Sequence, residues 1–444
     1  MALLKIRSCL VSCCVLLLTA SPPVAAQQQQ VQSCSDEQIV DAFHLSFPIG
    51  EMIRTRAAAL ARPGMATAPP LNRFRHRQRL STPEDRRVTA PNVDTLYSAA
   101  WFDLSEGPLQ LSVPVVAPGR YVSVAVMDMA GDHLAIVHPS SVKKRELWLQ
   151  GPGAKSSQAG QDDIYLPVAR GWMIARVFVA GPDDLAQART IQEALSLAGH
   201  VPALPELPTG TSSADALLAS VNTELAAGPP PKSIGAALPK LRCAGLGLEG
   251  PSWENLPELV KSRWRTLMPE LLEDLKKGFA TETVGSWRSV HPATGTVAAP
   301  SHVRAAIALS GLGALPVEEA AYFRTDADRD GNPLHGRNHY RIQLPADVPT
   351  KSFWSLTAYD LQPDGRLFLY RNDIDRFAIN SASQDLVREP DGSIVVTISS
   401  DGKMERHNWL PVPPGAFSMI FRIYKPDDEK AFAEYTPPGI EVQD

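Results

Sequence analysis

Residues 96–104 read LYSAAWFDL, residues 109–116 read LQLSVPVV, and residues 121–129 read YVSVAVMDM. These runs are short and rich in β-branched and aromatic side chains, which favour strands. The pairs Gly107-Pro108 and Pro118-Gly119 between them are typical of turns. Further runs of the same kind follow at 134–138, 146–150 and 172–179. Strands that recur every 8–12 residues with such turns are typical of a β-sandwich.

A second group of strand-like runs begins after residue 338, at 340–344, 352–359, 367–370, 393–399 and 417–424. Proline–glycine turns separate them, for example at Pro363-Asp364-Gly365 and Pro390-Asp391-Gly392. The predicted fold class is therefore mainly β with a helical insert. We expect two jelly-roll-like antiparallel β-sandwich domains joined by α-helices.

Apolar residues between these two groups recur every three or four positions, which predicts helices at 185–197, 214–226 and 253–279. A further helix should begin near residue 36, where Ser35 and Gln38 have the spacing of a capping box, and should end at Pro48. A second helical piece should then run from 49 to about 61. The predicted domains are a signal peptide at 1–26, an N-terminal helix and β-sandwich at 35–182, a helical connecting region at 183–322, and a C-terminal β-sandwich at 323–444.

The N-terminus has the pattern of a secretory signal peptide. Lys5 and Arg7 precede an uncharged apolar run at 9–20, and Val24-Ala25-Ala26 has the small residues of a cleavage site. The run is about 12 residues, too short for a transmembrane helix. We expect cleavage after Ala26 and a periplasmic or extracellular location, the alternative being an N-terminal membrane anchor.

Two cysteines, Cys34 and Cys243, remain after the predicted cleavage. An even number of cysteines in an oxidising compartment favours a disulfide, with two free thiols as the alternative. Cleavage would remove two of the 43 basic residues and none of the 48 acidic ones, which leaves a net charge of −7. No basic patch remains, so no nucleic-acid partner is expected. No later stretch is long and apolar enough to form a transmembrane segment.

Strong catalytic signatures are absent from the sequence, including the Gly-x-Ser-x-Gly elbow, the P-loop, a dinucleotide fingerprint after a strand and His-Glu-x-x-His. Weaker candidates lie at the start of the first strand group, where Asn92, Asp94 and Tyr97 could present an amide, a carboxylate and a hydroxyl to a ligand. Asp94 and Tyr97 are the candidate catalytic residues. The candidate ligand-binding residues are Asn92, Trp101, Asn408 and Trp409. Buried core tryptophans are the alternative interpretation.

Asp326, Asp328 and Asp330, followed by Gly331, resemble the start of a calcium-binding loop. The twelfth position of that loop is Arg337 instead of a bidentate glutamate, so a polar turn is the stronger interpretation. No cofactor is therefore expected, and calcium is kept as a hypothesis.

The stretch from 72 to 104, which contains Pro91-Asn-Val-Asp-Thr-Leu-Tyr-Ser98, resembles the domain-of-unknown-function family numbered 1254. The stretch from 340 to 438, which contains Asn408-Trp-Leu-Pro411, is similar to its usual C-terminal companion, the family numbered 1214. The resemblance implies two jelly-roll-like sandwiches with helices between them, commonly in bacterial proteins. It implies no established reaction.

Two classes of function fit these observations. The first is an exported protein that binds, and could hydrolyse, a small polar or carbohydrate-like ligand, with Asn92, Asp94, Tyr97, Asn408 and Trp409 lining one cavity. The second is a structural or assembly protein without catalysis that uses the faces of its sandwiches as interfaces in a homo-oligomer. The sequence identifies neither the ligand nor whether the protein is an enzyme.

Overall fold

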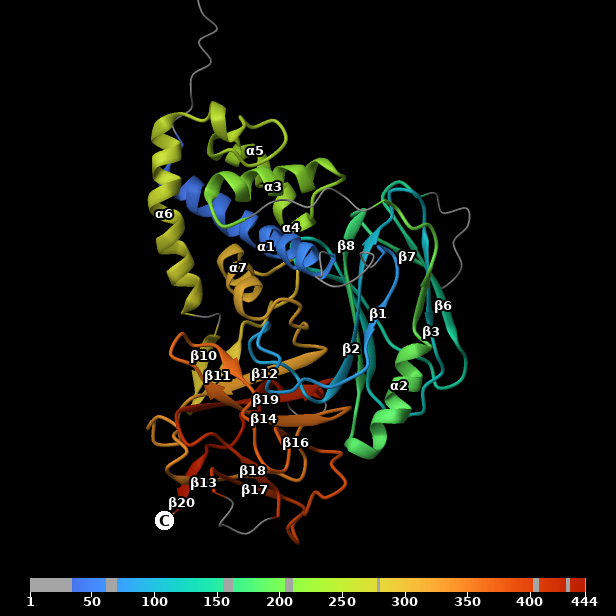
Figure 1. Ribbon diagram of the computed structural model, residues 1–444, viewed down its shortest axis with the longest axis vertical. Coiled ribbons are helices and arrows are strands. Elements are labelled where there is room, and N and C mark those ends of the chain that lie inside the picture. The colour runs from blue at the N-terminus through green and yellow to red at the C-terminus, as the bar shows by residue number, and fades with distance from the viewer. Residues whose placement is uncertain are drawn as a thin grey trace, which may run out of the picture. The chain divides into compact units, whose positions relative to one another are not determined.

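The computed structural model describes residues 34–60, 70–154, 163–203, 211–277, 280–401, 407–428 and 432–443. Within these residues the strands form four mainly antiparallel sheets, which pack in pairs as two β-sandwiches. The predicted mainly β class with a helical insert is confirmed (Figure 1). The signal peptide and its cleavage site lie outside the described residues. None of the helices in the described ranges has the length and hydropathy needed to cross a membrane.

The N-terminal sandwich packs a sheet of strand order β1-β2-β8-β4-β5 on a sheet of order β7-β6-β3-β9. Its core consists of the alternate apolar side chains of both sheets, such as Leu96, Leu111, Val124 and Val177. The strands are β1 (Arg75–Arg77), β2 (Thr95–Asp103), β3 (Leu109–Val113), β4 (Val122–Met127), β5 (His133–Val137), β6 (Arg145–Gln150), β7 (Ile164–Tyr165), β8 (Arg170–Phe178) and β9 (Ser196–Ala198).

The C-terminal sandwich packs a sheet of order β10-β11-β12-β19-β14-β15, with β16 also paired to β14, on a sheet of order β18-β17-β13-β20. Its core is again apolar and includes Trp354, Val396 and Phe421. The strands are β10 (Ala280–Val284), β11 (Trp287–Val290), β12 (Ala320–Thr325), β13 (His339–Leu344), β14 (Trp354–Leu361), β15 (Leu367–Phe368), β16 (Ala378–Asn380), β17 (Ile394–Ser399), β18 (Trp409–Pro411), β19 (Phe417–Tyr424) and β20 (Glu441–Gln443).

The main helices pack together around α1 (Asp36–Leu60), which contacts α3 (Ala214–Ala226), α6 (Glu258–Lys276) and α7 (Ser301–Ser310) (Figure 1). The shorter helices are α2 (Leu185–Glu193), α4 (Lys232–Gly235) and α5 (Leu238–Leu241). The predicted helix at 214–226 is confirmed, and the helix predicted at 253–279 is found over Glu258–Lys276, starting after Pro257. The expected helical region at 183–322 also contains β9 of the first sandwich and β10 and β11 of the second.

The predicted end of the first helix at Pro48 is wrong, because α1 continues through this residue to Leu60. Pro48 removes one backbone donor, but both halves of the helix are buried against the other helices, and this packing outweighs the lost hydrogen bond. The capping box is confirmed. The Gln38 N–H donates to Ser35 Oγ at 3.2 Å, and the Ser35 N–H donates to Gln38 Oε1 at 3.0 Å.

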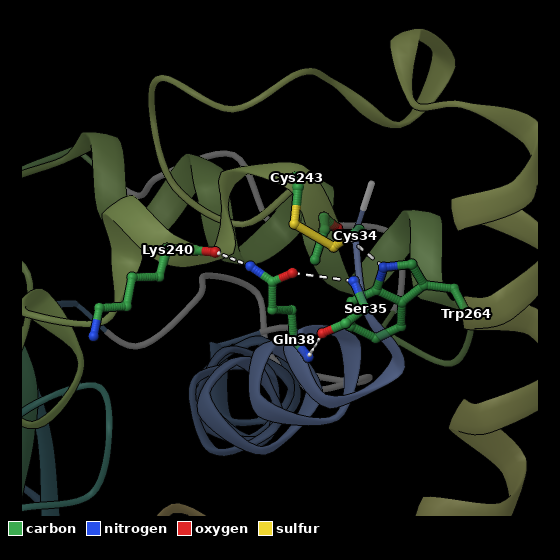
Figure 2. The surroundings of a disulfide bond; sticks show 7 residues. Cys34, Ser35, Gln38, Lys240, Cys243 and Trp264 are labelled. Carbon is green, nitrogen blue, oxygen red and sulfur yellow. Dashed lines mark hydrogen bonds between the residues drawn. A yellow bond between two sulfur atoms is a disulfide. The ribbon is translucent and has the colours of Figure 1, made fainter. Parts of the chain in front are cut away.

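The predicted disulfide is confirmed and joins Cys34 to Cys243, with the two Cα atoms 5.3 Å apart (Figure 2). Gln38 Nε2 donates to the Lys240 carbonyl at 2.8 Å, and Trp264 Nε1 donates to the Ala244 carbonyl at 3.0 Å. The start of α1 is thus attached to the segment around Cys243 by the disulfide and by the Gln38 hydrogen bond, and Trp264 of α6 binds the same segment from the other side of Cys243.

We expect the double variant Cys34→Ser/Cys243→Ser to lose about 2–5 kcal/mol of unfolding free energy, because the bond closes a long loop in the unfolded chain. Urea unfolding followed by circular dichroism measures the change. Reduced wild-type protein should match the double variant, and the variant itself should not respond to a reductant. Equal stability of oxidised and reduced wild-type protein would contradict this expectation.

Candidate functional site

The two sandwiches contact each other through sheet faces that carry polar side chains. On the N-terminal sheet, Tyr97, Arg176 and Ser123 stand side by side on β2, β8 and β4. On the C-terminal sheet, Tyr322, Arg422 and Ser355 form a matching row on β12, β19 and β14. Because side chains alternate along a strand, the opposite face of each sheet still supplies the apolar core of its own sandwich.

We call the polar side chains between these two sheets the inter-sheet cluster. Its members are Asn92, Asp94, Tyr97, Arg176, Tyr322, Ser355, Asn380, Arg422 and Tyr424.

Asp94 is 2% exposed and joins the two sandwiches directly. Ser355 Oγ donates to its Oδ2 at 2.5 Å, and Asn380 Nδ2 donates to its Oδ1 at 3.3 Å. Burial raises the pKa of the Asp94 carboxyl above its usual value, although the hydrogen bond from Ser355 and the charge of Arg422 act in the opposite direction. Asn92 supports this position, because its Oδ1 accepts the Asp94 N–H at 2.6 Å.

Arg422 is a buried guanidinium with acceptors at both of its terminal nitrogens. Its Nη1 donates to Thr357 Oγ1 at 3.0 Å, and its Nη2 donates to Tyr359 Oη at 2.9 Å and to the Ala90 carbonyl at 3.2 Å. Burial alone would lower the pKa of Arg422, but Tyr359 and the other neighbours raise it overall, so this side chain stays charged.

Arg176 is the other buried guanidinium, 5% exposed. Its Nη2 donates to the Gly313 carbonyl at 2.8 Å, and its Cζ lies 5.5 Å from the centre of the Tyr97 ring. Its Nη1 is buried without a hydrogen-bond partner. Within the residues that the structure describes, no carboxylate forms an ion pair with Arg176, and the groups around it are mainly tyrosines.

A separate acidic contact lies next to the inter-sheet cluster. Glu319, 3% exposed, accepts a hydrogen bond from Tyr121 Oη at 2.6 Å and forms an ion pair with Lys425 Nζ at 2.9 Å. Burial alone would raise the pKa of Glu319, but His138, Lys425 and Tyr121 hold it below its usual value. Phe353 stacks on Tyr424 beside this contact, with ring centres 4.2 Å apart, and packs against Phe178 of the other sandwich.

The predicted site residues fall into two groups. Asn92, Asp94 and Tyr97 belong to the inter-sheet cluster, where Asn92 Nδ2 donates to Tyr424 Oη at 2.5 Å. Trp101 is 5% exposed and stacks on Trp172 with ring centres 5.1 Å apart, so it packs as a core residue beside the helices.

Asn408 and Trp409 lie elsewhere, on the other sheet of the C-terminal sandwich. Asn408 Nδ2 donates to the carbonyls of Val387 and Val395, and Trp409 Nε1 donates to Ser399 Oγ at 3.0 Å. Leu410 points into the sandwich core, so its neighbour Trp409 faces away from that core. The prediction that all five residues line one cavity is therefore wrong, because the motif around Asn408 stabilises its own loop and strand.

Sequence reasoning missed the partners of Asp94 and both buried arginines. A signal was present: Arg176 and Arg422 are each the one charged residue of a mostly apolar run, WMIARVFV and FSMIFRIY. A lone charge in a strand that is apolar on both faces indicates a buried polar contact. Which residues complete that contact depends on how the two sandwiches pack.

The predicted calcium ligands do not converge. Asp326 pairs with Arg288 and Arg324, whereas Asp328 Oδ1 accepts the backbone N–H groups of Asp330 and Asn332. Asp330 is exposed. In the described ranges, no group of three or more His, Cys, Asp or Glu side chains is placed to hold a metal ion. The aspartate repeat forms a polar turn, the alternative that the sequence favoured.

Two family models match the chain in the predicted order. Residues 71–199 match the model of the family DUF1254, and residues 319–428 match the model of the family DUF1214; each is described as a protein of unknown function. The chain belongs to the DUF1254–DUF1214 proteins. Asp94, Tyr97 and Arg176 lie in the first matched region, and Arg422 and Tyr424 lie in the second. The inter-sheet cluster of this DUF1254–DUF1214 protein thus takes residues from both families.

Two solved structures resemble this DUF1254–DUF1214 protein. The VPA0106 protein from Vibrio parahaemolyticus is 22% identical, with a TM-score of 0.71 over 92% of this chain and 100% of that chain. This similarity shows the fold. An uncharacterised protein from Burkholderia cenocepacia is 12% identical, with a TM-score of 0.46 over 92% of each chain. A comparison with curated proteins finds no match.

Two buried aspartates, Asp128 and Asp132, lie at the turn between β4 and β5. Asp128 Oδ1 accepts the N–H groups of Ala130 at 2.8 Å and Asp132 at 3.1 Å, while its Oδ2 has no partner. Arg304 Nε donates to Asp132 Oδ1 at 3.1 Å. Burial and the nearby Asp132 carboxylate raise the pKa of Asp128 to about 7. The turn at Asp328 has the same backbone bonds, but Asn332 there donates to the aspartate.

We expect Asp128→Asn to stabilise the protein at pH 8 and to do so less at pH 5. The pKa of Asp128 is higher in the folded state than in the unfolded state, so folding favours its protonated form. The contribution of this form to the free energy of unfolding is lost as the pH rises from about 4 through about 7. The amide of the variant cannot ionise and avoids this loss, which should amount to at least about 1 kcal/mol. Urea unfolding at both pH values measures the difference.

The exposed Asp330 provides the control for this experiment, and Asp330→Asn should leave the pH dependence of stability as in the wild type. If Asp128→Asn changes stability by the same amount at pH 5 and pH 8, then Asp128 does not titrate in this range.

Proposed function

We propose that this chain is an exported protein that binds a small polar ligand between its two sandwiches, at the inter-sheet cluster. The observation that carries the proposal is the buried Arg176, whose Nη1 has no partner. Removing a charge from water costs several kcal/mol unless partners compensate. A protein that retains such a group at a junction between domains has a candidate binding site there.

Two tyrosines of the cluster support a ligand because they are not fully buried. Tyr97 and Tyr322 are only half-buried, so part of each side chain remains accessible to solvent. Their hydroxyl groups and the Arg176 guanidinium are suited to hydrogen bonding with a polar molecule. Export to the periplasm or the extracellular space is supported by the N-terminal sequence pattern and by the Cys34–Cys243 disulfide.

The role of Asp94 is better supported as an anchor than as a general base. Both carboxylate oxygens already accept hydrogen bonds, from Ser355 and from Asn380. A general base must lie within hydrogen-bond reach of the proton that it removes, and Asp94 is only 2% exposed, so little of its carboxylate is open to a substrate. Hydrolysis with Asp94 and Tyr97 as catalytic residues stays a prediction, and ligand binding is the function that the geometry favours.

A second candidate function is structural. The hydrogen bonds of Asp94 with Ser355 and Asn380 would also stabilise the junction in a scaffold without a ligand. Such a protein would use its sandwich faces in a homo-oligomer. A monomer at high concentration in light scattering, together with specific ligand binding, would exclude this candidate.

We expect at least one compound in a screen of polar metabolites to raise the melting temperature of the wild-type protein, because a ligand that binds only the folded state must stabilise it. A compound at 100 times its Kd should add about 2.7 kcal/mol. Differential scanning fluorimetry measures the shift. A panel of sugars, polyols, organic acids and amino acids without any shift would refute the proposal.

We expect Asp94→Asn to retain binding of any compound found, within about tenfold, because asparagine can keep one of the two hydrogen bonds. If a hydrolytic activity is found, the same variant separates the two roles. Retained turnover supports an anchor, and retained binding without turnover identifies Asp94 as the base. Ser105→Ala, a change outside the inter-sheet cluster, serves as the matched control.

A further inference from the structure

We propose that Arg176 binds the carboxylate of a small organic acid, which rests on the proposed function and names the chemical class of its ligand. The two buried arginines of the inter-sheet cluster differ in one respect. Both Nη atoms of Arg422 have acceptors on the protein, whereas Nη1 of Arg176 has none. An incoming oxyanion would supply the acceptor that Arg176 lacks.

Tyrosine hydroxyls around Arg176 add further donors. Tyr424 Oη accepts from Asn92 Nδ2 at 2.5 Å, and Tyr322 Oη accepts the Leu315 N–H at 3.2 Å. In the described hydrogen bonds, neither hydroxyl donates its own proton to the protein. Each can therefore donate to an oxyanion, as the Tyr97 hydroxyl beside Arg176 also can.

The charges favour a single negative charge on the ligand. The Asp94 carboxylate accepts hydrogen bonds from Ser355 and Asn380 and is close enough to Arg422 to feel its charge. The Glu319 carboxylate forms an ion pair with Lys425 and accepts a hydrogen bond from Tyr121. Arg176 is left with one positive charge that no carboxylate of the described residues pairs with. A carboxylate carries one negative charge, whereas a phosphate group near neutral pH carries about −1.5 to −2. A carboxylate is therefore the better match.

His133 specifies a second group on the ligand. Its Nδ1 lies 3.1 Å from the Gly295 carbonyl, which can only accept, so Nδ1 carries the proton. Nε2 is then a buried acceptor, and it has no partner. Burial and the charge of Arg176 lower the pKa of His133 to about 3, so the ring is neutral. A hydroxyl on the acid would donate to Nε2, which favours a hydroxy acid.

A small pocket borders the loops that contact Arg176 and His133. It has room for about one water molecule, and Asp132, Gly295, Arg304 and Gly313 are among its lining residues. The carbonyls of Gly295 and Gly313 accept from His133 and Arg176, respectively. The loops that hold both unpartnered side chains therefore border the same pocket.

The test measures the melting temperature of the disulfide-bonded protein with lactate, with propionate and with the amide of each acid. Sodium chloride at matched ionic strength and sodium phosphate are measured beside them. We expect lactate to raise the melting temperature most, propionate less, and the two amides and chloride not at all. Calorimetric titration should give at least about tenfold weaker lactate binding for Tyr97→Phe, which removes only a hydroxyl. Arg176→Met should fold and should lose the response to both acids.

Arg120→Gln is the control, because Arg120 pairs with Asp184 outside the inter-sheet cluster, and it should respond as the wild type does. An equal response of Arg176→Met and wild type to the acids would overturn the proposal, as would equal effects of the acids and their amides, or a larger effect of phosphate. If no acid binds but a neutral metabolite does, the carboxylate assignment fails and the proposed function stands. If nothing binds, both fail.

Discussion

The contact between the two sandwiches depends on compensating buried charge. Each sandwich has its own apolar core, and the sheet faces that meet carry arginines, tyrosines and one aspartate. Buried polar groups must find partners, so the packing is determined by hydrogen bonds such as those from Ser355 and Asn380 to Asp94. These directional contacts act together with a buried apolar cluster that spans the junction and includes Ala125, Phe178 and Phe353.

The same requirement explains why one group without a partner is informative. Arg422, Glu319 and Asp94 all have their partners on the protein, and Arg176 has one of its two Nη atoms unpaired. At the junction of the two sandwiches, three of these four buried charged groups are satisfied and the fourth is incomplete, which is a property of binding sites. The aromatic rings of Phe178 and Phe353 pack beside these groups, with Phe353 stacked on the ring of Tyr424.

The helical region connects to this arrangement through α7 and the loop that follows it. The loop carries Gly313, whose carbonyl accepts from Arg176, at a backbone φ of +82° that favours glycine. A side chain at this position would meet Ile174 Cδ1 at 2.9 Å. The helices thus contribute to the site through backbone groups, while α1 and the disulfide hold the helical region together.

The sequence alone determined the class of fold, the two groups of strands, the capping box at Ser35 and the cysteine pair, because these depend on local periodicity, turn residues and composition. It also located Asn92, Asp94 and Tyr97. Only the tertiary structure decided that Arg176, Arg422 and Tyr424 join them and that Asn408 and Trp409 do not. Strand periodicity shows which side chains share a face, but which two faces meet is decided by packing between residues more than 200 positions apart.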